Sequence, residues 1–400
     1  MIRFNNDYNC GAHPRVIEAL VRTSAENHPG YGLDAWCERG AQAIRAQADA
    51  PEAAVHFVVG GTQANFLVIA SALRPYQSVI SADTGHINEH ETGAVEHAGH
   101  KIQALPSIDG KITAAQVEEV ACSVPKYDGF CTVPEHIVQP KMVYLSYTSE
   151  FGTLYSKREL EDLSAVCREH GLYLFVDGAR LSYGLAAPES DVTMADLARL
   201  ADAFTVGGTK CGALFGEAIV LTNPALHEGF RSNMKQNGAM LAKGWLLGLQ
   251  FATLFEPAEG EAAGESAPAN ASEKATEPAS GESAAEPTPA TDGRASEAPA
   301  QEPLYLAIAR QADEQALRIK ATFAQAGVPF FIESPTNQQF VVMPDRVLDD
   351  LAKKYVFEYE QRIDDAHSCV RFCTSWSTKP EDVDALVADI EALARAGKLA

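Results

Sequence analysis

The fold of this chain is decided by Leu172-Tyr173-Leu174-Phe175-Val176-Asp177-Gly178-Ala179-Arg180 and, some thirty residues later, by Ala203-Phe204-Thr205-Val206-Gly207-Gly208-Thr209-Lys210. Each stretch is a short apolar run that predicts a buried strand, and each ends in a charged side chain. Open α/β sheets place their ligands at the carboxyl ends of the strands. We therefore expect the Asp177 carboxylate and the Lys210 amine to lie near one edge of a sheet.

A carboxylate and an amine in this arrangement favour the chemistry of pyridoxal phosphate (PLP). The amine of Lys210 would form a Schiff base with the cofactor. The carboxylate of Asp177 would keep the pyridine nitrogen protonated, so that the ring can accept electrons. The pair therefore predicts a PLP-dependent enzyme in which Lys210 and Asp177 are catalytic residues.

The composition of the 400 residues is that of a globular protein, with 46% hydrophobic and 22% charged residues. The net charge of −22 argues against a general affinity for nucleic acids or anionic membranes. The chain shows neither an apolar signal-peptide core after Met1 nor an apolar run of about 18 residues, which predicts a cytoplasmic protein. Eight scattered cysteines without a Cys-x-x-Cys pair predict free thiols rather than disulfides or zinc ligands.

The composition changes between Pro257 and Pro303, where Ala, Pro, Glu, Ser and Thr dominate. This segment holds ten acidic and two basic residues, and it has no aromatic residue, Leu, Ile or Val. It cannot bury enough apolar surface to offset the entropy lost on ordering, which predicts a disordered insertion. We thus expect an N-terminal arm and large cofactor-binding domain (1–256), the insertion (257–303) and a small C-terminal domain (304–400).

Strands and helices alternate in the predicted large domain. We expect strands over 55–59, 78–82 and 141–146 and two more that end at Asp177 and Lys210. Helices are predicted over 62–73, 88–98, from the capping box Ser156-Lys157-Arg158-Glu159 to about 170, and over 230–255. This alternation predicts a mainly parallel sheet covered on both faces. After the insertion we expect an α+β unit with helices over 304–326 and 381–396 and strands over 328–332, 340–343 and 370–373.

A pair of glycines joins a predicted strand to a predicted helix in Val58-Val59-Gly60-Gly61-Thr62-Gln63-Ala64-Asn65. Free amides at a helix N-terminus bind phosphate, and glycines let the backbone approach it closely. The stretch matches neither the Walker loop nor the Rossmann fingerprint. Alone it fits a plain strand–helix turn better, but beside Asp177 and Lys210 it favours phosphate binding.

His86 follows a predicted strand and precedes a predicted helix, so we expect it near the same edge of the sheet. A PLP ring needs a flat group stacked on the face opposite its lysine, and an imidazole can also transfer protons near neutral pH. A metal site built from His86, His90 and Glu91 is the alternative. The His-Glu-x-x-His spacing of zinc enzymes is missing, so no metal is predicted.

Arg371 stands at the beginning of a predicted strand in Val370-Arg371-Phe372-Cys373-Thr374-Ser375-Trp376. A planar guanidinium is suited to bidentate capture of an amino-acid carboxylate. A surface arginine is the simpler alternative, and the flanking pattern favours substrate binding over it.

Together these motifs resemble the threonine aldolase and aromatic amino acid β-eliminating lyase family of fold-type I PLP-dependent enzymes. The resemblance runs from the N-terminus to about Ile390, with the acidic insertion as a gap. It is carried by Gly61-Thr62-Gln63-Ala64-Asn65, His86 with Glu91, Asp177-Gly178-Ala179-Arg180, Gly208-Thr209-Lys210 and Arg371-Phe372-Cys373-Thr374-Ser375-Trp376. It implies a mainly parallel seven-stranded sheet with helices on both faces and a small C-terminal α+β domain.

The resemblance also implies roles for individual residues. It implies cofactor binding by Lys210 as the Schiff base, Asp177 on the ring nitrogen, His86 stacked on the ring, and Gly61, Thr62 and Gln63 on the phosphate. Arg180 and Arg371 would bind the substrate carboxylate. Tyr31 matches a tyrosine that reaches a neighbouring subunit's active site, and Lys235 matches a basic cofactor-binding residue. A homodimer or homotetramer with active sites at the subunit interface is therefore expected.

Three positions depart from the family pattern. Asn6 stands where many members carry a serine that contacts the carboxylate. The segment 148–153 replaces one in which typical aldolases carry a histidine near the substrate hydroxyl. The family's Lys-x-x-Gly-Gly-Gly-Met-Arg segment is only partly kept around Lys235, because the matching arginine is absent and Lys243 lies one place beyond it.

The resemblance implies retro-aldol cleavage of a β-hydroxy-α-amino acid, such as threonine or allo-threonine, to glycine and an aldehyde. Because the second histidine is missing, the proton acceptor for the substrate hydroxyl would be His86, a water, or no group at all. Two alternatives stay open from the residues alone. One is β-elimination or transamination on the same scaffold, and the other is a catalytically silent PLP-binding protein.

Overall fold

The computed structural model describes residues 1–123, 134–258 and 301–399. Most of the predicted insertion therefore lies outside the described residues. Its two described ends lie side by side, because Pro257 and Pro303 form an antiparallel bridge and the amide of Ala258 donates to the Glu302 carbonyl over 2.9 Å. The chain thus leaves and re-enters the folded body at one point.

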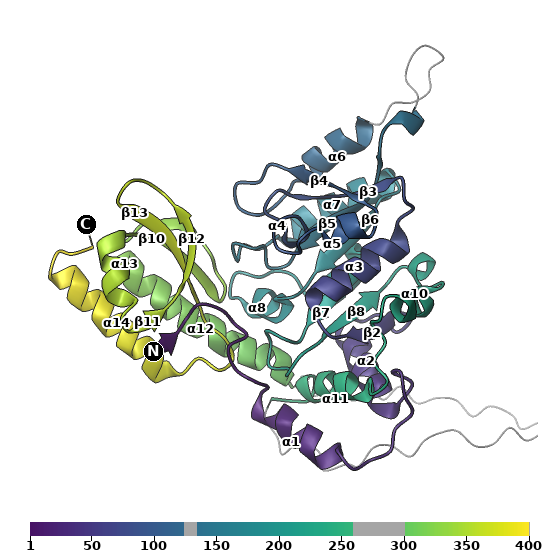
Figure 1. The fold of residues 1–400 in the computed structure, drawn as a ribbon, viewed down its shortest axis with the longest axis horizontal. Coiled ribbons are helices and arrows are strands. Elements are labelled where there is room, and N and C mark those ends of the chain that lie inside the picture. The colour runs from purple at the N-terminus through teal and green to yellow at the C-terminus, as the bar shows by residue number, and fades with distance from the viewer. Residues whose placement is uncertain (124–133, 259–300, 400) are drawn as a thin grey trace, which may run out of the picture.

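A seven-stranded sheet forms the centre of the molecule (Figure 1). Its order is β2 (Ala54–Val58), β8 (Glu217–Leu221), β7 (Ala203–Gly207), β6 (Tyr173–Asp177), β5 (Gln139–Ser146), β3 (Gln77–Ala82) and β4 (Lys101–Leu105). Only β8 runs antiparallel to its neighbours. The predicted fold class, a mainly parallel seven-stranded sheet, is confirmed, although β4 and β8 had no expected strand of their own.

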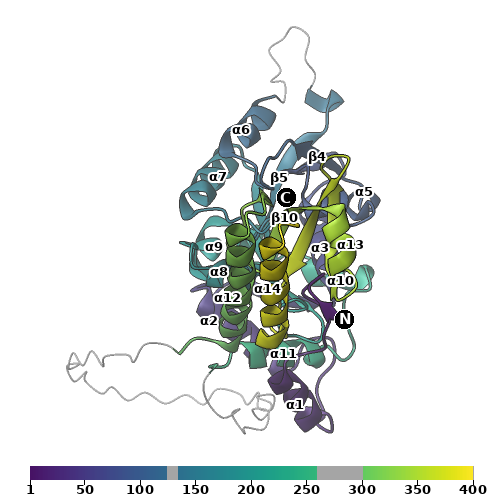
Figure 2. The ribbon, with the colours of Figure 1, turned by 90° about the vertical axis from the view of Figure 1, so that its left-hand side faces the viewer.

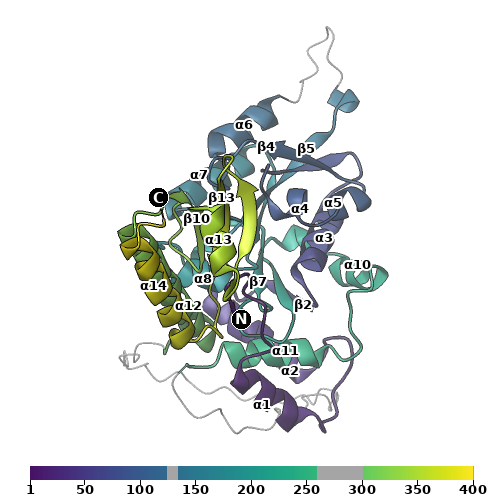
Figure 3. The ribbon, with the colours of Figure 1, turned by 60° about the vertical axis from the view of Figure 1, so that its left-hand side comes forward.

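Alternating side chains give the strands two buried faces. On β6, Leu174 and Val176 join one apolar cluster and Phe175 joins another. Helices α7 (Lys157–Glu169), α8 (Leu181–Ala186) and α9 (Met194–Leu200) contribute to the first cluster, and α3 (Gly61–Ala72) to the second. Figure 3 shows α3 and α7 on opposite sides of the sheet. Further helices of this body are α1 (Pro14–Thr23), α2 (Ala35–Gln47), α4 (His86–Glu89), α5 (Ala94–His97), α6 (Ala114–Cys122), α10 (Phe230–Gln236) and α11 (Trp245–Leu254).

The C-terminal unit contains a four-stranded antiparallel sheet with the order β12 (Glu358–Arg362), β13 (His367–Cys373), β10 (Gln338–Pro344) and β9 (Phe330–Ile332). Helices α12 (Leu304–Gln325) and α14 (Pro380–Arg395) run side by side over it (Figure 2), and α13 (Asp345–Leu351) follows β10. The N-terminal strand β1 (Ile2–Arg3) pairs with β11 (Tyr355–Val356). The N-terminal arm therefore packs on the C-terminal unit, where Phe4 is buried in its core.

Four expectations were wrong in detail. The long helix over 230–255 is two helices, α10 (Phe230–Gln236) and α11 (Trp245–Leu254), because Gly238 adopts a left-handed conformation with φ 69°. The helix over 88–98 is likewise split into α4 and α5, with Gly93 at φ 75° between them. The strand predicted to end at Lys210 ends at Gly207, and Arg371 lies inside β13 rather than at its beginning.

Two further properties concern residues 1–123, 134–258 and 301–399. Within them, no helix combines the length and apolar character that crossing a membrane requires. The cysteines described there are all free thiols, in agreement with the prediction from their spacing.

Candidate active site

Asp177 ends β6 at the carboxyl edge of the sheet and is buried. Its Oδ2 accepts hydrogen bonds from the Tyr144 hydroxyl at 2.6 Å and from Asn65 Nδ2 at 2.8 Å, and its Oδ1 accepts one from the Ala179 amide at 2.9 Å. Burial opposes ionisation, but the pKa of Asp177 still lies below its ordinary value because nearby His86 and these hydrogen bonds favour the charged form. The site therefore holds a buried carboxylate.

Lys210 lies in the turn between β7 and β8, and its carbonyl accepts a hydrogen bond from the Tyr183 hydroxyl at 2.6 Å. Burial lowers the pKa of the Lys210 amine, and the charge of Arg180 lowers it further. The amine is thus more readily neutral, which is the nucleophilic form. Glu217, buried on β8, has a pKa raised by burial, so the ionised carboxylates that act on this lysine are Asp7 and Asp177.

His86 is the first residue of α4, and its side chain is 33% exposed. Its Nδ1 lies 2.9 Å from Glu91 Oε1, which also accepts a hydrogen bond from Asn65 Nδ2 at 2.9 Å. Since Asn65 also donates to Asp177, one amide group links the buried carboxylate to the partner of the histidine. The structure therefore brings His86 and Asp177 into one hydrogen-bonded network.

The N-terminus of α3 carries Gly61, Thr62 and Gln63. No side chain caps this helix, and a Cβ added at Gly60 or Gly61 would meet nothing within 4 Å. The amide of Val59 donates to Gln63 Oε1 over 3.4 Å. An uncapped helix N-terminus with open space beside it can bind a phosphate. Together with a buried carboxylate and a lysine of lowered pKa, these residues fit PLP.

Arg180 forms a buried ion pair with Asp7, in which its Nε and Nη2 lie 2.7 and 3.1 Å from the two carboxylate oxygens. Burial opposes the charge on Asp7, but the charges of Arg180 and Lys210 and the hydrogen bonds from Arg180 and Asn337 together lower the pKa of that carboxyl below its ordinary value. Asn337 Nδ2 also donates to Asp7 Oδ2 over 3.0 Å. The guanidinium of Arg180 therefore has a carboxylate partner within the chain already.

Arg371 extends from β13, with Nη2 3.2 Å from the Asn5 carbonyl and Nη1 3.4 Å from Glu360. Its Nε is buried, and no described residue is its hydrogen-bond partner. Asn6, next to Asn5, accepts a hydrogen bond from the Tyr8 amide at 3.0 Å. The N-terminal arm and β13 thus lie together.

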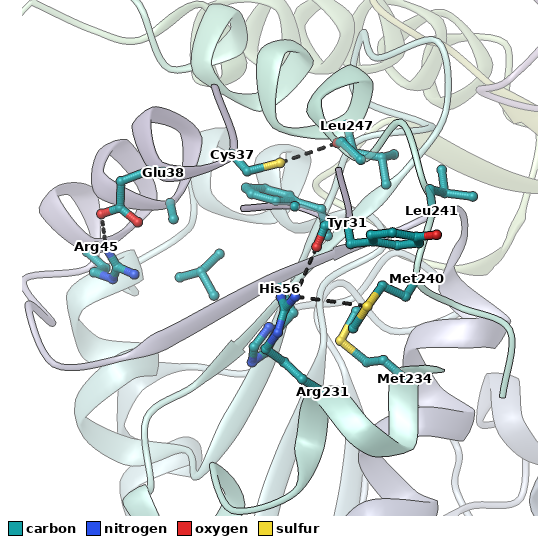
Figure 4. Close-up of a pocket in the computed structure, with 15 residues that line it drawn as sticks. Tyr31, Cys37, Glu38, Arg45, His56, Arg231, Met234, Met240, Leu241 and Leu247 are labelled. Atoms are coloured by element: carbon teal, nitrogen blue, oxygen red, sulfur yellow. Dashed lines mark hydrogen bonds and ion pairs between the residues drawn. The ribbon is translucent and has the colours of Figure 1, made fainter. Parts of the chain in front are cut away.

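Tyr31 and Lys235 lie together but apart from the other candidate residues. The Lys235 ammonium lies 4.5 Å from the centre of the Tyr31 ring. Tyr31 lines a cavity of about 70 Å³, shown in Figure 4, where Arg231 donates to the Tyr31 carbonyl over 3.0 Å. In the described part of the chain, no hydrogen bond or ion pair joins Tyr31 or Lys235 to Asp177, Lys210 or His86.

One group of described side chains has a geometry that could hold a metal ion, and it is not the one around His86. Glu118, Cys122 and His170 offer ligand atoms within 4.8 Å of one another. Glu118 and Cys122 are exposed, and all three residues lie outside the network around Asp177.

Sequence reasoning missed the residues that hold the site together. Tyr144 and Asp7 were given no role, and Asn65 appeared only within a motif. Glu91 was considered only as a ligand in the alternative metal site and as part of a motif, and Glu150 appeared only within a segment that departs from the family pattern. Glu150 Oε1 accepts hydrogen bonds from the His86 amide at 2.8 Å and from Ser146 Oγ at 2.7 Å. A buried-strand pattern was the available signal for Tyr144, since it lies on β5 two residues before the strand ends.

Comparison with known proteins gives a consistent result. The family model described as β-eliminating lyase matches residues 9–343. A low specificity L-threonine aldolase of Pseudomonas sp. (strain NCIMB 10558) is 33% identical over 258 residues, which cover 64% of this chain and 71% of that protein.

Two solved structures are similar over almost the whole chain. A Leishmania major threonine aldolase superposes with a TM-score of 0.84 at 35% identity, covering 98% of this chain and 100% of the other. A Sphingomonas wittichii serine palmitoyltransferase superposes with a TM-score of 0.65 at 13% identity, covering 99% of this chain and 87% of the other. The second similarity concerns the fold alone.

Proposed function

This chain belongs to the β-eliminating lyase family, and from that membership we propose that it is a PLP-dependent lyase that cleaves β-hydroxy-α-amino acids to glycine and an aldehyde. Threonine and allo-threonine are the proposed substrates. The observation that supports this most strongly is the buried, ionised Asp177 beside the turn that carries Lys210, whose amine has a lowered pKa.

The residues proposed to hold the cofactor each have a distinct task. The Lys210 amine would bond to its aldehyde carbon, Asp177 would pair with its ring nitrogen, and the α3 N-terminus at Gly61–Gln63 would bind its phosphate. His86 would lie against the ring. When bound, PLP supplies a ring that accepts the electrons of the broken Cα–Cβ bond.

Proton transfer at the substrate hydroxyl is assigned to His86. Glu91 occupies Nδ1, so Nε2 is the ring nitrogen available to accept the proton. A water held by Nε2 could carry the same proton. The substrate carboxylate is assigned to Arg371, whose Nε has no partner among the described residues, together with Arg180. Asn6 lies beside this arginine on the N-terminal arm.

A subunit interface is the second part of the proposal. Tyr31 is 44% exposed, and Leu33, two residues further on, is 69% exposed. Among the described residues, this exposed pair and Lys235 have no hydrogen bond or ion pair to Asp177, Lys210 or His86, and we propose that they complete the site of a second copy. Mixing an inactive Tyr31→Ala protein with an inactive Lys210→Ala protein should then restore activity, since hybrid oligomers would contain an intact site.

The decisive experiment is a product analysis. Purified protein is supplied with PLP and a panel of β-hydroxy amino acids, and glycine, aldehyde, ammonia and keto acid are measured. Glycine and aldehyde in equal amounts support retro-aldol cleavage. Ammonia and keto acid would instead indicate elimination or transamination, and no turnover on any member of the panel would indicate a silent PLP-binding protein.

A further inference from the structure

The loop between β5 and α7 contacts both the His86 segment and the C-terminal unit. On one side, Glu150 Oε1 accepts the hydrogen bond of the His86 amide at 2.8 Å, at the point where α4 begins. On the other side, the carbonyl of Gly152 accepts hydrogen bonds from Ser334 Oγ at 3.1 Å and Thr336 Oγ1 at 3.0 Å. Two neighbouring residues of one loop therefore face two different parts of the molecule.

Close approach of the C-terminal unit depends on Gly152. Its φ of 71° is in the left-handed region, and a Cβ at this position would lie 2.5 Å from Ser334 Oγ. Phe151 packs beside it, with its ring centre 5.6 Å from that of Phe340 on β10. A third contact follows from Gln338, whose Nε2 donates to the Glu150 carbonyl over 3.4 Å. The loop thus contacts β10 through Glu150 and Phe151, and through Gly152 it contacts the segment that leads into β10.

The same strand leads to the proposed carboxylate-binding residue. Phe340 is buried and lies directly opposite Arg371 in the antiparallel pairing of β10 with β13. A continuous set of contacts therefore runs from Arg371 through Phe340 and Phe151 to Glu150, and from Glu150 to the backbone of His86.

We propose that Glu150 is a positioning residue that couples the position of the C-terminal unit, and with it Arg371, to the position of His86. Movement of β10 when Arg371 binds a carboxylate would be transmitted to α4 through the loop, because packed side chains shift together. Glu150 Oε2 is buried with no described hydrogen-bond partner, so the carboxyl is held through Oε1 alone. The inference rests on the proposed roles of His86 and Arg371.

The first test needs no activity. Hydrogen–deuterium exchange of residues 85–90 should become about two- to tenfold faster in Glu150→Ala, because the His86 amide loses its acceptor. Phe151→Ala should have the same direction of effect, while Glu150→Gln, which keeps an oxygen acceptor, should resemble the wild type. Glu159→Ala is the matched control, since Glu159 Oε2 accepts the Ser156 amide at 2.7 Å at the start of α7.

The second test measures coupling in the PLP-loaded protein. The dissociation constant of glycine, followed by cofactor absorbance, and kcat are determined for Glu150→Ala, Arg371→Ala and the double variant. Glu150→Ala should lower kcat while PLP affinity is kept, and the double variant should lose less than the product of the two single losses. If the wild type releases no glycine from any substrate, the proposed function fails. The hydrogen–deuterium exchange of residues 85–90 then decides by itself whether Glu150 positions His86.

Two results would overturn the coupling. One is unchanged exchange at residues 85–90 in both Glu150→Ala and Phe151→Ala. The other is a double variant whose loss equals the product of the single losses in an active enzyme. If Glu150→Ala does not fold, Phe151→Ala, which keeps the Glu150 side chain but removes the packing that holds its loop against Phe340, decides both tests with Arg371→Ala.

Discussion

The hydroxyl of Tyr144 lies 2.6 Å from Oδ2 of Asp177, and this hydrogen bond joins two adjacent parallel strands at their carboxyl ends. Both residues are buried. Because the phenol donates, it stabilises the carboxylate over the protonated acid. The charge that the proposed chemistry needs is therefore maintained by a residue outside the recognised motifs.

Asp177→Asn should keep the fold and lose several orders of magnitude in kcat. An amide carries no negative charge, so it cannot keep the pyridine nitrogen protonated. Tyr144→Phe should lose less, about 10- to 100-fold, which corresponds to one hydrogen bond to a charged group. The kcat with threonine measures the loss of activity, and circular dichroism checks that the fold is kept. Near-wild-type turnover in Asp177→Asn would refute the cofactor assignment.

Lys210→Ala should abolish both turnover and covalent attachment of the cofactor. In the wild type, borohydride reduction should fix PLP to the peptide that contains Lys210, since reduction converts the Schiff base to a stable amine. Mass spectrometry of the digested protein identifies the labelled peptide. Label on a peptide centred on Lys235 or Lys243 would assign the cofactor to another lysine.

Removing the guanidinium of Arg371 should weaken glycine binding strongly and leave cofactor absorbance intact. A desolvated carboxylate that loses a charge-assisted partner costs about 2–5 kcal/mol. Arg371→Lys should recover little, because an ammonium cannot form the bidentate pair. A glycine titration followed by absorbance makes the measurement. Equal glycine affinity in Arg371→Ala and wild type would mean that the carboxylate binds elsewhere.

Arg180→Ala should differ from Arg371→Ala in its melting temperature. It leaves Asp7 buried without its ion-pair partner, a change that costs about 3–5 kcal/mol of folding free energy. We therefore expect a clear fall in melting temperature for Arg180→Ala and a small one for Arg371→Ala. Asp7→Asn serves as the comparison, and a normal melting temperature in Arg180→Ala would contradict the reasoning.

Replacing residues 259–300 by a short Gly-Ser linker should leave kcat and melting temperature nearly unchanged. Pro257 and Pro303 already pair across the base of the segment, so the linker has almost no distance to span. Shortening a loop changes its closure entropy only slowly with length. Activity with threonine and thermal unfolding make the test. A large loss of activity would show that the segment contributes to the site or to assembly.

The stability difference between Glu150→Gln and wild type should depend on pH. Burial raises the pKa of Glu150 above its ordinary value of 4.5, so the folded state keeps a proton that the unfolded chain releases. The free energy of unfolding contributed by this group therefore falls as pH rises from 4.5 to the folded-state pKa. Gln cannot titrate, so its melting temperature relative to wild type should rise from pH 4.5 to pH 8. An equal difference at both pH values would contradict this.

The chemistry at the strand ends could be read from sequence because its signals are local. An apolar run ending in Asp177 and a second one before Lys210 indicate strands, and parallel strands bring their carboxyl ends to one edge. The glycines before α3 and the position of His86 after β3 follow the same rule. Helix ends were less predictable. The break between α10 and α11 depends on a left-handed glycine, which apolar periodicity does not reveal.

Only the tertiary structure decided which side chains form hydrogen bonds and ion pairs with the charged residues of the site. Asn65 is 112 residues from Asp177 and Asp7 is 173 residues from Arg180, and no spacing rule connects them. The partners of a buried charge are set by strand order and by how the N-terminal arm packs on the C-terminal unit. The sequence by itself determined the fold class and predicted the cofactor chemistry, because both follow from short-range patterns. The network around the site depends on contacts that form only when distant segments are packed together.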